Sequence, residues 1–95
     1  MINNYSKFLS DAELLALQTE IISVARMKKI RKLYGLTQKK FAELINIKYD
    51  TLRSWEGGYR YPASPGRALL YLAEKSPETF LKDKDQILAF TSNLS

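Results

Sequence analysis

The chain has 95 residues, of which 45% are hydrophobic and 26% are charged, and its formal net charge at pH 7 is +5. This length allows one domain with a modest core. With no cysteine and no histidine, the chain lacks disulfides, thiolate metal sites and the usual acid–base group at neutral pH, so we expect neither an enzyme nor a bound cofactor.

Neither a metal ion nor a membrane is expected as a partner. The remaining metal candidate, Asp83 with Asp85, lacks the glycine and the distal glutamate of a calcium loop. No apolar run approaches the roughly 18 residues of a membrane span, and residues 1–4 do not begin a signal peptide. We therefore expect a cytoplasmic protein.

Residues 1–25 are expected to form an N-terminal flank that contains a helix. Ser10-Asp11-Ala12-Glu13 is a capping sequence, and apolar residues follow it at the spacing of a coiled-coil seam: Leu14, Leu17, Ile21 and Val24. This seam is too short to establish a coiled coil. Two interpretations are open: the helix packs on its own domain, or it offers a surface to a second subunit or another protein. Whether it continues into the next helix is also open.

The next helix is predicted to end at Gly35. Its inward face carries residues at spacings of three and four: Met27, Ile30, Leu33 and Tyr34. Gly35 freely adopts the left-handed backbone that stops a helix. The chain is therefore expected to turn at this point.

A short helix is then predicted to begin at Gln38 and to end at Asn46. Thr37 is a good N-cap, because its hydroxyl accepts from the free amides of the first turn. The residues expected to be buried are Phe41, Ala42, Leu44 and Ile45. Ala42 is small enough for two helices to cross closely. Asn46 tolerates a left-handed backbone, and Ile47 after it can fill the core between the helices.

A third helix is predicted from about Lys48 to Trp55, with Gly57-Gly58 closing it. Leu52 and Trp55 point inward, and Trp55 is expected in the core rather than as a platform for stacking bases. The outer faces carry polar, planar or basic side chains of the kind that read base edges: Lys48, Tyr49, Asp50, Thr51, Arg53 and Ser54. Two short helices across a tight turn, with another packed beneath, fit the major groove of DNA.

The C-terminal part of the chain is predicted to continue as helices. Pro65 and Pro77 suit first-turn positions after Ser64 and Ser76. A charged link over residues 82–85 then leads to a final apolar group: Ile87, Leu88 and Phe90.

The positive charge is concentrated where the short helices are predicted. Residues 26–67 hold 11 basic against three acidic side chains, a net charge of +8, whereas the two flanks together carry −3. Lys28, Lys29 and Lys32 alone fit an ordinary solvated face equally well. The coincidence of the whole basic block, residues 26–67, with the predicted DNA-binding helices favours phosphate contact.

The residues between Thr37 and Pro62 have the spacing of a known DNA-binding motif. They are Thr37, Gln38, Phe41, Ala42, Asn46, Ile47, Thr51, Leu52, Trp55, Glu56, Gly58 and Pro62. This pattern resembles the Cro/repressor-type (Xre) helix-turn-helix, with Asn46 where the family usually has glycine. The resemblance covers roughly residues 27–82. It implies an all-α fold, a compact lambda-repressor-like bundle of about five helices with an additional N-terminal helix.

The resemblance also implies a function. Such a protein regulates transcription by binding double-stranded DNA as a homodimer, with two reading helices in successive major grooves of a palindromic operator. The chain then divides into an N-terminal flank, 1–25, a helix-turn-helix domain, 26–82, and a C-terminal helix or tail, 83–95.

A narrower resemblance concerns residues 65–72, PGRALLYL, and residues 76–80, SPETF. They are similar to HigA-like and NadS-like antitoxins of type II toxin–antitoxin modules. This implies a bacterial, nucleoid-associated repressor of its own operon that also neutralises a RelE/HigB-like toxin. The toxin surface is expected on residues 5–24, with Ile87, Leu88 and Phe90 as second choice. A stand-alone Xre-type repressor without a toxin remains the alternative.

The candidate DNA-binding residues lie on the second and third of these helices and just after them. They are Gln38, Lys39, Lys40, Lys48, Tyr49, Asp50, Thr51, Arg53, Ser54, Tyr59 and Arg60. Gln38 resembles the family position that touches a phosphate and braces the reading helix, or else is an exposed helix former. Asp50 either accepts from a cytosine amino group or stabilises the helix N-terminus. The resemblance further implies a buried ion pair between Arg31 and Glu56, the alternative being two exposed charges.

Overall fold

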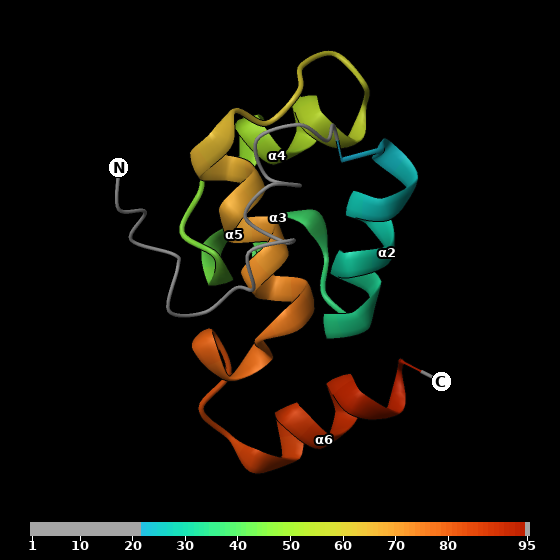
Figure 1. The fold of residues 1–95 in the computed structure, drawn as a ribbon, viewed down its shortest axis with the longest axis vertical. Coiled ribbons are helices and arrows are strands. Elements are labelled where there is room, and N and C mark those ends of the chain that lie inside the picture. The colour runs from blue at the N-terminus through green and yellow to red at the C-terminus, as the bar shows by residue number, and fades with distance from the viewer. Residues whose placement is uncertain (1–21, 95) are drawn as a thin grey trace.

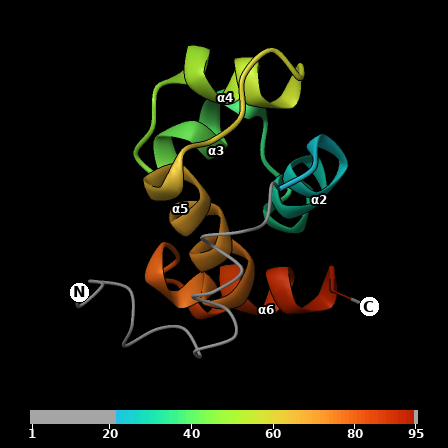
Figure 2. The ribbon, with the colours of Figure 1, turned by 45° about the horizontal axis from the view of Figure 1, so that its top comes forward.

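The computed structural model describes residues 22–94, and within this range it contains five α-helices, one short 3-10 helix and no β-strand. The elements are α2 (Val24–Tyr34), α3 (Gln38–Leu44), α4 (Tyr49–Glu56), α5 (Ser64–Lys75), the 3-10 helix η1 (Pro77–Thr79) and α6 (Lys84–Ser92). Figures 1 and 2 show α4 at one end of the molecule and α6 at the opposite end. The expected all-α bundle is confirmed, whereas the expected N-terminal helix lies outside the described residues.

The helix α2 begins with its own N-cap. Ser23 has an extended backbone (φ −68°, ψ 155°), and its Oγ accepts a hydrogen bond of 3.1 Å from the Arg26 amide. Helical backbone therefore does not run through Ser23 into α2. Ile22 is already in the core at 2% exposure, and Val24 packs against that core half-buried. The other members of the predicted seam lie outside the described residues: Leu14, Leu17 and Ile21.

The turn between α2 and α3 has the helix-ending glycine and the N-cap threonine that the sequence predicts. Gly35 has the left-handed φ of 65° and ends α2, and its amide donates to the Lys32 carbonyl at 3.0 Å. Thr37 is the N-cap of α3, where its Oγ1 accepts from the Lys40 amide at 3.2 Å. Both helix boundaries were therefore predictable from single residues.

The end of α3 is also left-handed, as predicted, with a φ of 62° at Asn46. The Asn46 amide donates to the Glu43 carbonyl at 3.2 Å and the Ile47 amide to the Ala42 carbonyl at 2.9 Å. This pair of bonds is the Schellman pattern, which satisfies the last carbonyls of a helix. Ala42 is 1% exposed, as the close crossing requires. Leu44, expected to be buried, is only half-buried, because it lies on a groove between α3 and α6.

The main core lies between α2, α3, α4 and α5. Its buried members are Ile22, Met27, Ile30, Phe41, Ala42, Ile45, Leu52, Trp55, Ala68, Leu70, Tyr71 and Ala73. Trp55 is 6% exposed, which confirms its core position. A Cβ at position 66 would lie 2.7 Å from Cη2 of Trp55, so Gly66 is what allows α5 to approach the indole ring so closely.

The helix α6 closes the end of the bundle away from α4. Phe90 is 2% exposed, and its ring centroid lies 4.8 Å from that of Tyr34. Asn93 Nδ2 donates to the Leu33 carbonyl at 3.0 Å, which fixes the end of α6 against α2. Placing Phe90 on an exposed docking surface was therefore wrong, because its side chain is enclosed by α2. Leu88 remains exposed at 63%.

Asp83 is the N-cap of α6, with its Oδ1 accepting from the Asp85 amide at 2.7 Å. The helix begins at Lys84, so the charged link is shorter than predicted. Pro65 and Pro77 both occupy first-turn positions, as expected. Within residues 22–94, no three potential metal ligands cluster, and no helix is long and apolar enough to cross a membrane.

Candidate nucleic-acid interface

The helix α4 buries one face and presents the other to solvent. Leu52 and Trp55 point into the core at 0% and 6% exposure. The opposite side carries three exposed residues of the helix, Tyr49, Asp50 and Arg53, and two half-buried ones, Thr51 and Ser54, and the exposed Lys48 lies just before the helix. Figure 2 shows α4 on the outside of the bundle, next to α3. This helix therefore has the exposure that a major-groove reader needs.

Arg53 gathers with Tyr49 and Asp50 on the outward face. Its Cζ lies 5.5 Å from the centroid of the Tyr49 ring, and its Nη1 lies 4.0 Å from Oδ1 of Asp50. The Arg53 and Asp50 side chains are 60% and 91% exposed, so their ion pair is weak. The Tyr49 ring therefore lies against the Arg53 guanidinium, whose N–H donors remain accessible to solvent. A guanidinium fork of this kind matches either the O6 and N7 atoms of guanine or a phosphate.

Lys48 and Asp50, at the start of α4, have different relations to the helix N-terminus. Lys48 is the N-cap residue of α4, where its side chain has no acceptor for the free amides of the first turn, and it is exposed. Asp50 lies in the first turn, where a carboxylate is favoured by the helix dipole. That position supports a helix-stabilising role for Asp50, and its contact with a cytosine stays a prediction.

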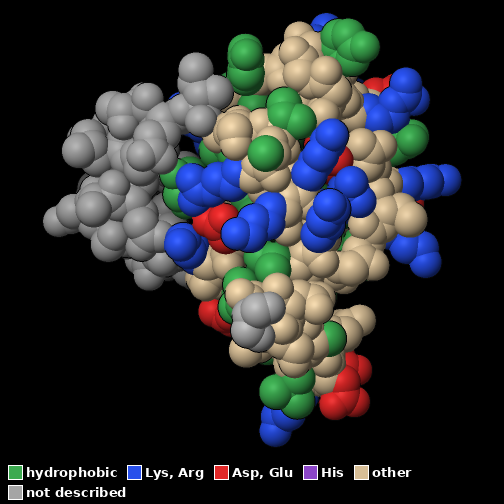
Figure 3. Space-filling view, turned by 90° about the vertical axis from the view of Figure 1, so that its right-hand side faces the viewer, with side chains coloured by type: hydrophobic (Ala, Val, Ile, Leu, Met, Phe, Trp, Pro, Cys, Tyr) green, Lys and Arg blue, Asp and Glu red, His purple; other side chains and the backbone are tan. Residues whose placement is uncertain are grey.

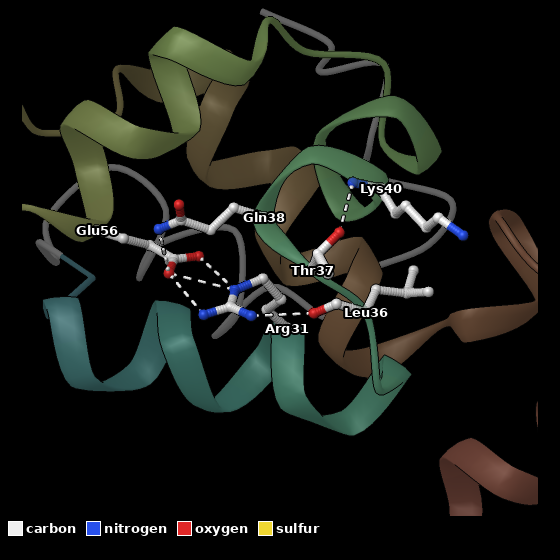
Figure 4. Close-up of polar contacts among 6 residues, drawn as sticks. All are labelled: Arg31, Leu36, Thr37, Gln38, Lys40 and Glu56. Carbon is white, nitrogen blue, oxygen red and sulfur yellow. Dashed lines mark hydrogen bonds and ion pairs between the residues drawn. The ribbon is translucent and has the colours of Figure 1, made fainter.

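A buried ion pair fixes the C-terminal end of α4 (Figure 4). Arg31 Nε lies 2.9 Å from Glu56 Oε2, and Arg31 Nη2 donates to Oε1 at 3.0 Å. Nη1 of the same guanidinium donates to the Leu36 carbonyl at 2.9 Å. The side chains of Arg31 and Glu56 are 19% and 1% exposed, so the expected buried pair is confirmed. It joins α2, the turn before α3 and the end of the predicted reading helix.

The start of α3 contributes to the same network. Gln38 Nε2 donates to Glu56 Oε1 at 3.1 Å, so Gln38 braces α4 and is not simply an exposed helix former. Lys39 and Lys40 are exposed. In Figure 4 the Lys40 side chain points away from Gln38 and Glu56, and it lines the groove between α3 and α6. The structure therefore does not bring Lys40 together with the α4 face.

The loop after α4 folds back on that helix. The amides of Tyr59 and Arg60 both donate to the Ser54 carbonyl, at 2.9 and 3.3 Å. A Cβ at Gly57 would lie 2.7 Å from Cε2 of Tyr59, so the ring lies directly over this glycine. Tyr59 is 86% exposed and forms a shallow depression with three residues of α4: Asp50, Arg53 and Ser54. Tyr61, not among the predicted contacts, is also exposed, at 66%.

A second ion pair, between α2 and α5, was not predicted. Arg26 Nη2 donates to Glu74 Oε1 at 2.7 Å, and the Arg26 guanidinium carbon lies 4.9 Å from the centroid of the Tyr71 ring. The hydrogen bond to Glu74 raises the pKa of Arg26 above its usual range. Arg26 and Glu74 are 48 residues apart, and no local pattern indicates their pairing.

Residues 27–73 match the family model described as helix-turn-helix. The chain carries a helix-turn-helix domain of the Cro/C1 type. The matched residues of this helix-turn-helix domain run from α2 into α5 and include the whole outward face of α4. The domain is therefore of a DNA-binding, regulatory kind. No curated protein and no solved structure matches the chain.

Proposed function

We propose that the protein is a sequence-specific transcriptional repressor that binds a palindromic operator as a homodimer, with α4 in the major groove. The observation that carries this proposal is the accessible face of α4, whose end is fixed by Glu56, Arg31 and Gln38. Base-edge recognition needs side chains that are exposed and also held in a defined direction. In this proposal the protein works in the bacterial cytoplasm, at the nucleoid while it occupies its operator.

The positions of the side chains suggest two kinds of contact. Tyr49, Arg53 and Ser54 lie on the outward side of α4 and are assigned to base edges, with the Arg53 fork suited to a guanine. Lys48 and Arg60 lie just before and just after α4, where phosphates flank the groove. Further phosphate contacts are assigned to the start of α3, to Gln38 and Lys39, whereas Lys40 is left out because it lines the groove between α3 and α6. A two-fold dimer would place both reading helices about one DNA turn apart.

Fluorescence anisotropy with DNA from the promoter of its own operon tests this proposal. Affinity should fall steeply with salt, with a log–log slope on the order of −5 to −9 for a dimer that neutralises several phosphates. Arg60→Ala should weaken operator and unrelated duplexes alike, because phosphates carry no sequence information. Lys84→Ala, at the opposite end of the molecule, should bind as wild type does. Salt-independent binding, or none to the promoter, would reject the DNA-binding proposal.

We further propose that this repressor is the antitoxin of a type II module and neutralises a RelE/HigB-like ribonuclease. The support is the resemblance over residues 65–72 and 76–80, together with the acidic balance of the N-terminal flank, which suits a basic partner. Gly66 and Pro77 within these segments also have packing and helix-starting roles, which a stand-alone repressor of the same fold would share. A repressor without a toxin is therefore the second candidate.

A truncation tests the proposed toxin surface, and the gene content of the operon separates the two candidates. Ile22 belongs to the core and Ser23 caps α2, so the truncation removes residues 1–20 and keeps both of these residues. In a growth-rescue assay with the toxin of the same operon, we expect this truncation to bind the operator but not to rescue growth. Rescue would show that the toxin docks elsewhere. An operon without a toxin gene would favour the stand-alone repressor.

A further inference from the structure

We infer that the outer face of α2 is a second phosphate-binding surface, which holds DNA flanking the operator while α4 reads the operator itself. This inference rests on the proposed DNA-binding function. The surface consists of Lys28, Lys29 and Lys32, and we call it the α2 lysine stripe.

The α2 lysine stripe covers one continuous face of the helix. With Ala25 it follows the spacing i, i+3, i+4, i+7, which places four side chains along one side of an α-helix, and all four are exposed. Figure 3 views the molecule from the side on which α2 lies and shows Lys and Arg side chains gathered across it. The stripe is thus part of a broad basic surface on this side of the domain.

The basic side chains of α2 divide into paired and unpaired groups. Arg26 is paired with Glu74, and Arg31 is paired with Glu56. Within residues 22–94, no carboxylate forms an ion pair with any lysine of the stripe. The arginines therefore hold the fold together, whereas the lysines present uncompensated positive charge to solvent.

Helix stability explains the position of only one of the three lysines. Lys32 lies in the last turn, where a cation is favoured by the helix dipole. Lys28 lies four residues before Lys32, and like charges at this spacing destabilise a helix slightly. Lys29 adds a third charge near the middle of α2 without a neighbouring acid. Binding of an anionic partner would explain why α2 carries these three lysines, since the stability of the helix does not require all of them.

The stripe adjoins the end of the molecule that carries α4. Around the α2 axis, Lys28 lies about 60° from Arg31, whose guanidinium bonds to Glu56, the last residue of α4. Lys32 and Lys29 lie about 100° and about 160° from Arg31, so the stripe leads away from the α4 end. At the start of α2, Val24 Cγ2 lies 3.9 Å from where a Cβ would stand on Gly58, in the loop after α4. The stripe therefore continues the basic surface of the reading end along the side of the domain.

DNA is the partner that this placement favours. Because the start of α2 lies beside the loop after α4, bending a duplex held by α4 toward the stripe would bring its phosphates within reach of the lysines. Bending a duplex costs free energy, which added phosphate contacts offset. The expected consequence is that operator affinity depends on DNA beyond the two half-sites.

The test measures affinity by fluorescence anisotropy with two operator duplexes. One has about 20 base pairs and contains only the half-sites, and the other has about 50 base pairs and includes flanking DNA. Wild type should bind the long duplex roughly tenfold more tightly. The variant Lys28→Gln/Lys29→Gln/Lys32→Gln should bind the short duplex as wild type does, but it should lose most of the tighter binding to the long duplex. On the long duplex, the log–log slope of its affinity against salt should also be shallower than that of wild type by about 3 to 5.

The matched control is Lys75→Gln/Lys82→Gln/Lys84→Gln, which removes the same charge from exposed positions near the α6 end and should keep the long-duplex advantage. Circular dichroism should show that both triple variants are folded. The inference is overturned if the stripe variant keeps the long-duplex advantage, if wild type has none, or if the variant weakens both duplexes equally. Failure of the proposed function is a separate result: wild type would not distinguish the short operator from a scrambled duplex.

Discussion

The Glu56 carboxylate joins three helices, so its removal should destabilise the whole domain. Its side chain is 1% exposed and accepts hydrogen bonds from Nε and Nη2 of Arg31 and from Nε2 of Gln38. In Glu56→Ala the Arg31 guanidinium would keep only its bond to the Leu36 carbonyl. Removing one partner of a buried pair costs about 3–5 kcal/mol. Because Arg31 is 19% exposed and can be partly rehydrated, we expect the lower end, about 3 kcal/mol.

Thermal unfolding followed by circular dichroism measures this loss. In a domain of this size 1 kcal/mol lowers Tm by about 4–8 °C, so Glu56→Ala should melt at least about 12 °C below wild type. The control is Asp50→Ala, whose side chain is 91% exposed and whose loss should cost under about 1 kcal/mol. Arg31→Met with Glu56→Leu should recover much of the stability, because no buried charge is left alone. A Glu56→Ala protein that melts within about 2 °C of wild type would refute the reasoning.

Three further predictions concern packing, backbone and pH. Gly66→Ala should lower stability by about 1–3 kcal/mol and shift the emission of Trp55, because the new Cβ would lie 2.7 Å from the indole ring; unchanged stability would contradict that packing. Asn46→Gly should be nearly as stable as wild type in urea, whereas Asn46→Ala should lose about 1–2 kcal/mol at a φ of 62°; equal stabilities of the two variants would contradict the assignment. Burial raises the pKa of Tyr34, so its neutral form stabilises the fold fully below pH 10, and this contribution is lost as pH rises through the raised value. Tyr34→Phe should therefore lose less stability than wild type between about pH 9 and about pH 11, and an identical pH dependence would contradict this.

The sequence was most informative where structure depends on one or two neighbouring residues. Gly35, Thr37 and Asn46 set helix ends through their own backbone preferences and hydrogen bonds, and all three were predictable. Helical spacing likewise separated the buried Leu52 and Trp55 from the exposed face of α4. The Arg31–Glu56 pair was anticipated only through the family resemblance, because charge spacing alone does not distinguish a buried pair from two exposed charges.

Long-range packing was the part that sequence patterns could not supply. Whether Phe90 is exposed depends on where α6 packs, and nothing near Phe90 indicates that α2 covers it. The direction of Lys40 depends on that same placement, since it borders the groove between α3 and α6. The pairing of Arg26 with Glu74 likewise needs the tertiary arrangement of α2 and α5. These features connect distant segments and leave no periodic signal.

The central claim, that α4 reads base edges, is tested most directly by titrating wild type, Tyr49→Ala and Arg53→Ala against a set of operators with single base-pair changes at constant salt. Each substitution should remove roughly 1–3 kcal/mol of discrimination at particular base pairs of each half-site and leave the others unaffected. The Lys84→Ala control should show the wild-type pattern throughout. A uniform loss of affinity across all operators would contradict the claim and make these side chains backbone contacts.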